Sequence, residues 1–553
     1  MKKPLLSELT LREKIGQTCV AWIKFSKGDP EYFKKNPYGA VWSSHWMTHD
    51  PEVIEEFKAH GYDLGDTKNY EEIYSQWTRD VNKNLRVPLI SPLDAEAGQA
   101  GNFYNASGTV SQMCYGSAND EELVYKIGQK VAEQSLAGGC HWIWGPVADC
   151  PGMFCGGMTL RHYSYDIDQI SRLVCAQIKG IQSMGVAATA KHFPGVDRHE
   201  YRDAHFQPSL MGYTLEEWEK EQAPSFQAAI DAGVYSVMVG HGAFPAVDDT
   251  MVDEAYIPCT LSHKVVTGLL KEKMGFKGVV ITDGINMRGL TAVYQGAKLY
   301  VELLRAGNDM ILGPEADDYI DAVEAAVLSG DLPESRIDDA CQRVLDMKEK
   351  LGMFREDHVF GGGITQEMRD EMDAVTKEAA RKGISLVVDK TNMLPISAEK
   401  IKKVGLRFDG YHNVDYILST FKAAFEKHGA EVIDFQDIPE GIEAAEVFKE
   451  KQKDVDLIVY ISHIGGHSPM GWPGFSGKEK CDPFYRFILT SGKEKSIGIS
   501  LAYPFMYYNY YLSCPVFINT FGSGKVSIEE CVNGLYGEFE FNRNRTIPIK
   551  PEF

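Results

Sequence analysis

The sequence has no apolar run that approaches the ~18 residues a membrane-spanning helix needs. It is short of basic residues, because 57 Lys and Arg against 78 Asp and Glu give the 553-residue chain a formal net charge of −21. So acidic a surface repels phosphate backbones and anionic lipids, which disfavours nucleic-acid and membrane partners. The chain start lacks the apolar core of a signal peptide, and the 11 cysteines show no disulfide spacing. Together these features predict a cytoplasmic protein with reduced thiols.

Eight short apolar runs alternate with helix-like segments over the first part of the chain. Such runs are typical of parallel strands that helices cover on both faces, and eight of them favour a (β/α)8 barrel over an open doubly wound sheet. Thr10 followed by Glu13 is a capping box that predicts a helix start. We therefore expect an α/β chain whose residues 1–360 form a barrel catalytic domain with strands at 18–23, 39–43, 88–93, 141–147, 186–190, 236–240, 278–282 and 309–312.

A second unit is predicted after three consecutive glycines at 361–363, which are typical of a turn or linker. Helical periodicity covers 366–382 and 414–427, and new strand-like runs alternate with such segments. This order predicts an α/β sandwich domain over residues 361–553, with strands at 384–388, 404–408, 431–435, 457–462, 497–502 and 516–520.

Polar side chains follow most strands of the predicted barrel. In such barrels function lies on the loops that follow the carboxyl ends of the strands. A strand-end Asp can instead cap the next helix, and a single His is more often a buried core residue than a catalyst. Several of them in chain order indicate a polar pocket at the barrel mouth, lined by Asp94, Glu96, Asp149, Lys191, His192, His241 and Asp283.

Two of these positions suggest chemistry. Asp283 follows an apolar run and precedes Gly284, so a tight turn would present its carboxylate at the barrel mouth, as a nucleophile requires. Asp203 and His205 lie two residues apart, so in an extended segment the carboxylate can orient and charge the imidazole. A His held in this way can donate a proton and later accept one. On its own, the Asp203–His205 pair would also fit a solvated polar loop.

Several motifs then resemble the family 3 glycoside hydrolases in order and spacing. The segments are LTLREKIGQ, LDAEAG, KHFPG, IPCTLSHKVVTGLLKEKMGFKGVVITDGINMRGL, LLRAGNDMIL and SRIDDACQRVLDMKEKLGMF, and they cover residues 9–354. The stretch LAYPFMYYNYYLSCPVFINTFGS is similar to that family's second domain. The resemblance implies a barrel followed by an α/β sandwich.

The resemblance also implies roles for residues. Asp283 matches the family's nucleophile, and Asp203-Ala204-His205 resembles the Asp-Ser-His motif whose His is the acid/base of the β-N-acetylglucosaminidase branch. The second-domain segment HIGGHSPMGWPGFSG, where other members carry a catalytic Glu, contains no carboxylate. The positions that match the branch's sugar-hydroxyl contacts are Asp94, Arg161, Lys191 and His192.

The expected function is therefore a retaining, exo-acting β-glycoside hydrolase that releases terminal β-N-acetylglucosamine through a covalent glycosyl-Asp intermediate. It needs no metal and no cofactor, and the C-x4-C spacing of Cys150 and Cys155 is poor for zinc. We expect a small carbohydrate substrate and leave a homodimer open. The alternatives are a phosphorylase that uses phosphate as acceptor, since a neutral His repels it less than a Glu would, a β-glucosidase, and an inactive sugar-binding protein.

Overall fold

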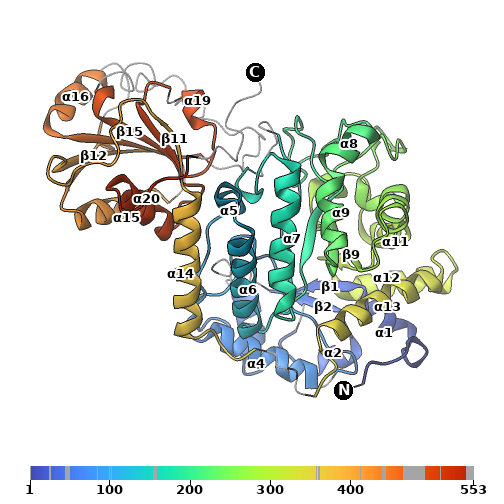
Figure 1. Cartoon of the computed structure of the whole chain (residues 1–553). Helices are drawn as coiled ribbons and strands as arrows, with labels where there is room; N and C mark the ends of the chain where they lie inside the picture. Colours follow the sequence, from blue (N-terminus) through green and yellow to red (C-terminus); the bar gives the residue numbers. More distant parts are fainter. Residues whose placement is uncertain are drawn as a thin grey trace. The chain divides into compact units, whose positions relative to one another are not determined.

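The structure is a computed structural model of the chain, and its elements are labelled in Figure 1. It describes residues 2–543 except 24–26, 44–49, 84, 99, 101, 153–158, 357, 359–360, 411–412, 439–443, 465–491 and 511. Two compact units are present. The first unit comprises Met1–Thr109, Glu121–Cys150 and Ile170–Asp373, and the second unit comprises Val110–Asp120, Pro151–Gln169 and Ala374–Phe553.

Eight short strands of the first unit pair in parallel. They form three sheets, ordered β10-β1-β2, β3-β4 and β5-β6-β9. Isolated parallel bridges join neighbouring sheet edges, namely Ala40 with Ile90, Trp142 with Ala187 and Ile281 with Met310. The strands are β1 (Cys19–Trp22), β2 (Ala40–Trp42), β3 (Pro92–Leu93), β4 (Trp142–Ile143), β5 (Thr189–Phe193), β6 (Ser236–Val239), β9 (Val279–Thr282) and β10 (Ile311–Leu312). A separate antiparallel hairpin is made by β7 (Met251–Val252) and β8 (Ala255–Tyr256).

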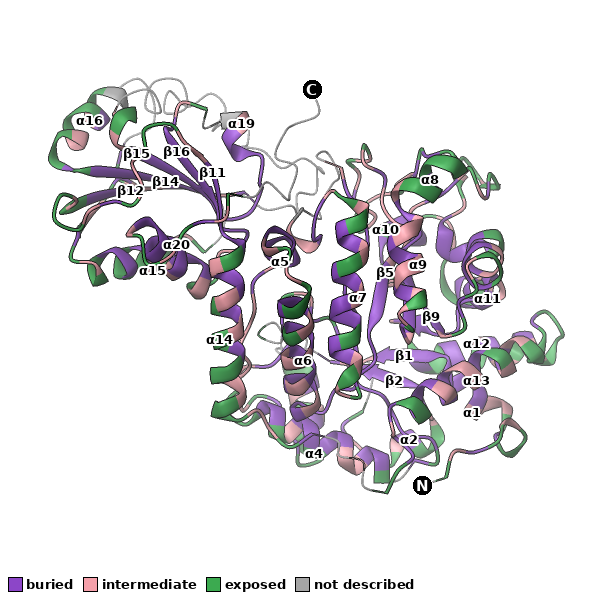
Figure 2. Cartoon of the chain, viewed as in Figure 1, coloured by how far each residue is buried: buried purple, intermediate pink, exposed green. Residues whose placement is uncertain are grey.

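Helices separate these strands along the chain. In the first of them the side chain of Thr10 accepts from Glu13 N–H while Glu13 accepts from Thr10 N–H, so the predicted capping box is confirmed. Figure 2 shows α6 and α7 with one buried and one exposed stripe, as expected where a helix packs on strands. The helices are α1 (Leu11–Gln17), α2 (Tyr32–Lys35), α3 (Pro51–Ala59), α4 (Tyr70–Lys83), α6 (Glu121–Ala137), α7 (Ile167–Ser183), α8 (Leu215–Glu221), α9 (Ala223–Asp231), the π-helix η6 (Lys264–Lys273), α10 (Arg288–Thr291), α11 (Gly296–Ala306), α12 (Ala316–Leu328) and α13 (Glu334–Lys350).

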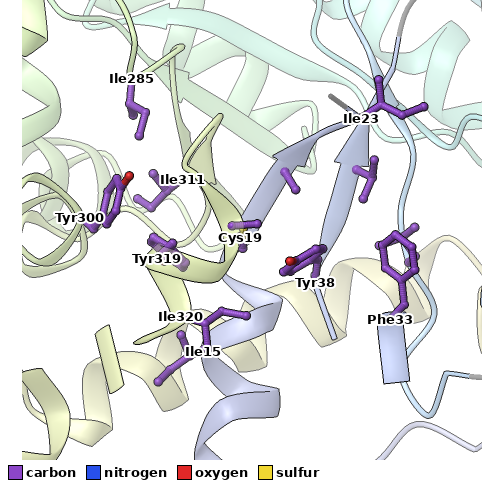
Figure 3. Packing of buried hydrophobic residues seen from close by; sticks show 14 of the residues in the cluster. Ile15, Cys19, Ile23, Phe33, Tyr38, Ile285, Tyr300, Ile311, Tyr319 and Ile320 are labelled. Atoms are coloured by element: carbon purple, nitrogen blue, oxygen red, sulfur yellow. The ribbon is translucent and has the colours of Figure 1, made fainter. Parts of the chain in front are cut away.

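The core of the first unit contains buried tyrosines whose hydroxyl groups form hydrogen bonds. Figure 3 shows Cys19 of β1 with Tyr38 and Tyr319 nearby. The hydroxyl of Tyr319 lies 2.6 Å from Thr18 Oγ1, and the hydroxyl of Tyr38 donates to Asp317 at 2.8 Å. Satisfying these polar ends allows large aromatic rings to be buried without an unpaired donor.

The second unit is built on one six-stranded sheet. Its order is β11-β16-β15-β14-β12-β13, with β11 antiparallel to β16 and all other neighbours parallel. Figure 1 shows α15 and α20 on one face of this sheet and α16 on the other. The elements are β11 (Ser385–Asp389), β12 (Lys403–Gly410), β13 (Glu431–Asp434), β14 (Leu457–His463), β15 (Ser496–Ser500), β16 (Val516–Asn519), α5 (Gln112–Ala118), η4 (Thr159–Arg161), α14 (Gln366–Gly383), α15 (Val414–Lys427), α16 (Ala444–Lys451), α19 (Met506–Tyr510) and α20 (Lys525–Leu535).

The α/β class is thus confirmed, and each predicted strand overlaps an observed one. The greatest shift concerns the run predicted at 186–190, because the strand is Thr189–Phe193 and includes two polar residues, Lys191 and His192. The runs predicted at 88–93 and 141–147 shorten to Pro92–Leu93 and Trp142–Ile143. Within the described residues, no helix combines the length and apolar character that crossing a membrane requires.

Candidate active site

Asp283 begins the turn that follows β9. Its backbone N–H donates to Val239 O at 2.9 Å, and its carboxylate accepts from Gly284 N–H at 2.7 Å. Burial raises the pKa of Asp283, but the imidazoles of His192 and His241 and the Gly284 N–H favour the carboxylate more strongly and lower the pKa to about 2. With its side chain 20% exposed, Asp283 is an ionised carboxylate that a small molecule can reach.

His192 is aimed at Asp283 by a second, fully buried carboxylate. Asp149 accepts from the backbone N–H of His192 at 2.9 Å and from its ring Nδ1 at 2.8 Å. The other ring nitrogen, Nε2, then lies 4.0 Å from Asp283 Oδ2. Because an ionised carboxylate can only accept, Asp149 fixes the proton on Nδ1. The Lys191–His192 peptide bond is cis.

Lys191 lies between two carboxylates that follow β3. Its Nζ is 2.7 Å from Asp94 Oδ1 and 2.6 Å from Glu96 Oε1, and its side chain is buried. Glu96 is mostly buried, whereas 43% of the Asp94 side chain is exposed. A buried ammonium flanked in this way holds the partly exposed carboxylate of Asp94 in a fixed position.

Asp203 and His205 form a close pair on the loop after β5. One oxygen of the buried Asp203 accepts from His205 N–H at 2.9 Å and from His205 Nδ1 at 2.6 Å. The loop is attached to the segment that follows Asp283, since Arg288 N–H donates to His205 O and Gly289 N–H donates to Ala204 O. His205 also helps to lower the pKa of Asp283, so the two groups interact electrostatically.

A second Asp-x-His sequence on the same loop is arranged differently. Asp197 also accepts from the backbone N–H of the His two positions later, but its oxygen is 3.8 Å from His199 Nδ1. The other oxygen of Asp197 accepts from Gly212 N–H at 2.6 Å, and the His199 side chain is 77% exposed. The Asp197 carboxylate therefore fastens the loop, whereas Asp203 holds an imidazole.

The sequence predicts His241 only as one more polar strand end, and the structure connects it to the turn that begins at Asp283. Its Nε2 donates to Gly284 O at 2.9 Å, and its Nδ1 lies 3.0 Å from the hydroxyl of Thr260. Burial lowers the pKa of His241, which favours a neutral ring. The position after a strand was the signal for Asp149, Glu96 and His241, but sequence reasoning assigned none of them a partner.

The remaining predicted residues belong to the second unit. Arg161 ends η4 and belongs to the second unit. Of the segment HIGGHSPMGWPGFSG, only His463 and Ile464 are among the described residues, and the rest falls outside them. Across the part of the chain that the structure describes, no group of three or more His, Cys, Asp and Glu side chains is arranged to hold a metal ion.

A small set of charged groups thus follows neighbouring parallel strands. An ionised carboxylate lies beside an imidazole that a second carboxylate orients, and a further carboxylate–imidazole pair is attached to the same turn. In chemical terms, such a set can form a covalent bond through one carboxylate and move a proton with a His.

Comparison with known proteins identifies the family. Residues 10–347, more than half of the chain, match the Glycosyl hydrolase family 3 N terminal domain, and the chain belongs to this family. A Cellulomonas fimi protein named beta-N-acetylglucosaminidase/beta-glucosidase is 28% identical over 331 residues, which are 59% of this chain and 58% of that protein. The chain therefore spans less than two thirds of that relative's length.

Two solved structures share the fold over nearly the whole chain. The beta-glucoside phosphorylase BglX has a TM-score of 0.82 at 23% identity, covering 99% of this chain and 95% of its own. A family 3 beta-N-acetylglucosaminidase from Paenibacillus sp. str. FPU-7 has a TM-score of 0.80 at 22% identity, covering 99% and 100%.

Proposed function

We propose that the chain is a retaining, exo-acting β-glycoside hydrolase that releases terminal β-N-acetylglucosamine. The observation that carries the proposal is the pairing of an ionised Asp283 with a His205 that Asp203 orients at 2.6 Å. The Cellulomonas fimi relative's name and the Paenibacillus enzyme's activity support the choice of sugar.

In the proposed reaction Asp283 attacks the anomeric carbon while His205 gives a proton to the departing oxygen. The bond to the leaving group breaks, and its electron pair takes the proton from Nε2, because Asp203 occupies Nδ1. The new bond joins the sugar to Asp283. In the second half, neutral His205 accepts a proton from water, whose oxygen attacks the same carbon from the face opposite Asp283. The bond between this carbon and Asp283 breaks, its electron pair returns to the carboxylate, and the original configuration is restored. The scheme uses no metal.

We assign sugar binding to charged groups on β5 and after β3. Asp94 offers an exposed carboxylate oxygen to sugar hydroxyls, and Lys191 holds it there. His192, positioned by Asp149, presents Nε2 toward the bond-forming region. Arg161 is proposed as a further hydroxyl contact, on its match to the family's motif alone.

We also propose that the eight parallel strands close into a barrel, within a barrel domain of residues 1–360 that precedes a sandwich domain of residues 361–553. The parallel bridges that link the three sheets support closure. Residues from successive strands, including Val20, Ala40, Trp142 and Met238, belong to one buried cluster, as inward-facing layers of a barrel do.

A phosphorylase is the second candidate, and the nature of the acid/base favours it. A neutral His beside the glycosyl-Asp repels an incoming phosphate less than a carboxylate would. The likeness to the β-glucoside phosphorylase structure is compatible with this candidate.

The test is turnover of aryl β-N-acetylglucosaminide and aryl β-glucoside side by side, with and without phosphate, using Asp283→Ala as control. Release of free N-acetylglucosamine, unaffected by phosphate and lost in the variant, supports the hydrolase. Sugar 1-phosphate as the main product supports the phosphorylase, and activity on the glucoside alone identifies a β-glucosidase. Inactivity of the wild type on both substrates refutes the enzymatic proposal and favours a sugar-binding protein.

A further inference from the structure

A second pocket lies at the start of β9, whereas Asp283 follows its end. Its volume is about 320 Å³. Lys277 lies two residues before the strand and lines this pocket, and the four residues of β9 span about 13 Å. The pocket is therefore separate from the candidate active site.

The lining of this pocket is strongly basic. Five cationic side chains and one His face two acidic side chains, although the whole chain carries a net charge of −21. An excess of positive charge in so acidic a protein concentrates anions locally. The cations are Lys271, Lys277, Arg305, Arg336 and Arg343, and the acids are Glu272 and Asp339.

One buried carboxylate behind the pocket is already shared among several donors. Asp309 accepts from Lys271 Nζ at 2.7 Å, from Val280 N–H at 2.9 Å and from Arg336. Arg343 donates to Gly278 O and to Asp339. Burial, together with the neighbouring Arg336 and Arg343, lowers the pKa of Lys271 to about 8 despite the attraction of Asp309.

Donors in this pocket also remain available. The Nε of Arg336 is buried and has no hydrogen-bond partner among the described residues. Lys277 is exposed, and within the same part of the chain it takes part in no ion pair. A network built for stability alone would match its cations with carboxylates and leave no buried guanidinium donor unpaired.

We propose that this pocket binds a phosphate group, either as the inorganic ion or as part of a sugar phosphate. A tetrahedral dianion supplies several acceptor oxygens, and guanidinium groups bind it with paired, charge-assisted hydrogen bonds. Arg336 provides a buried Nε donor with Arg343 beside it, and the exposed Lys277 and Arg305, which also pairs with Glu302 and Asp331, line the same pocket. The site is additional to the sugar pocket and does not depend on the glycosidase proposal.

The test is isothermal titration of the full-length protein with inorganic phosphate, glucosamine 6-phosphate and uncharged glucosamine at constant ionic strength. We expect the two phosphates to bind and glucosamine not to bind at this site; the tighter phosphate identifies the source. A double variant, Lys277→Gln with Arg305→Gln, should weaken phosphate binding by about tenfold or more, since each substitution removes a charged donor. The Lys277 side chain is exposed and 39% of the Arg305 side chain is exposed, and circular dichroism checks that the double variant folds.

Lys273→Gln is the matched control, because Lys273 lies on the same helix η6 and pairs with Glu219 outside the pocket. It should bind phosphate as the wild type does. The proposal is overturned if the wild type binds neither phosphate, or if the double variant binds as tightly as the control. If phosphate bound only at the active site, the double variant would bind it as tightly as the control. The comparison therefore distinguishes binding in this pocket from binding at the active site.

Discussion

Replacing Asp203 by Asn tests whether His205 acts as the proton donor. The amide oxygen of Asn can still accept from His205 N–H, which keeps the loop in place, but the negative charge next to Nδ1 is lost. A neutral partner stabilises the imidazolium less, so the variant should be impaired where a proton must reach the leaving group.

The size of the effect follows from the contact and its exposure. A hydrogen bond between charged groups contributes about 1.5–3 kcal/mol, and each 1.36 kcal/mol is about tenfold in rate. The His205 side chain is 47% exposed, so water screens the pair and the lower part of this range applies. We therefore expect kcat/KM to fall roughly 10- to 30-fold for substrates whose leaving group needs a proton.

The assay compares two leaving groups on the same sugar. A phenyl glycoside needs a proton on departure, whereas a 2,4-dinitrophenyl glycoside leaves as a stable anion. For Asp203→Asn, kcat/KM should fall for the phenyl substrate and change by less than about threefold for the dinitrophenyl substrate. His205→Ala should show the same contrast more strongly.

The loop provides its own control in Asp197 and His199, which have the same spacing without the close ring contact. His199→Ala should leave both substrates unaffected. Equal losses on both substrates for Asp203→Asn would refute proton donation and indicate a purely structural role. An equal effect at His199 would show that the loop, and not the dyad, controls the reaction.

Three further predictions concern charge. Because the pKa of Asp283 is about 2, trapping by an activated fluoro-glycoside should not slow from pH 6 to about 4; a fall centred near pH 5 would contradict the geometry. Burial lowers the pKa of Lys348 to about 7, so between about pH 7 and 10 the unfolded chain binds more protons than the folded chain, and the stability of the wild type rises with pH. The Lys348→Met variant lacks this gain, so its free energy of unfolding relative to the wild type should fall over the same window. A difference that stays constant with pH would refute the lowered pKa. Asp309→Asn leaves buried cations uncompensated and should lower the free energy of unfolding, measured in urea, by about 3–5 kcal/mol. Asp339 is half-exposed, so Asp339→Asn should lower it by about 1 kcal/mol or less. Equal losses would show that burial is not the cause.

Much of the fold follows from local patterns. The apolar runs, the capping box at Thr10 and the helix over Val414–Lys427 depend on neighbouring residues, so the sequence predicts them directly. β5 shows where such patterns fail. Its apolar run ends at Ala190, but the strand continues through Lys191 because Asp94 and Glu96, about a hundred residues earlier, compensate the buried ammonium. Hydrophobic periodicity cannot register a partner so distant in sequence.

The candidate site divides in the same way. The sequence itself shows which residue types follow the strands and that Asp283 precedes a glycine. Two Asp-x-His sequences, however, lie six residues apart on one loop, and spacing alone treats them equally. Only the tertiary structure distinguishes them, because backbone hydrogen bonds to the segment after Asp283 hold the Asp203–His205 stretch while Gly212 engages Asp197. Contacts between distant segments decide which imidazole receives a carboxylate, and such contacts exist only in the folded chain.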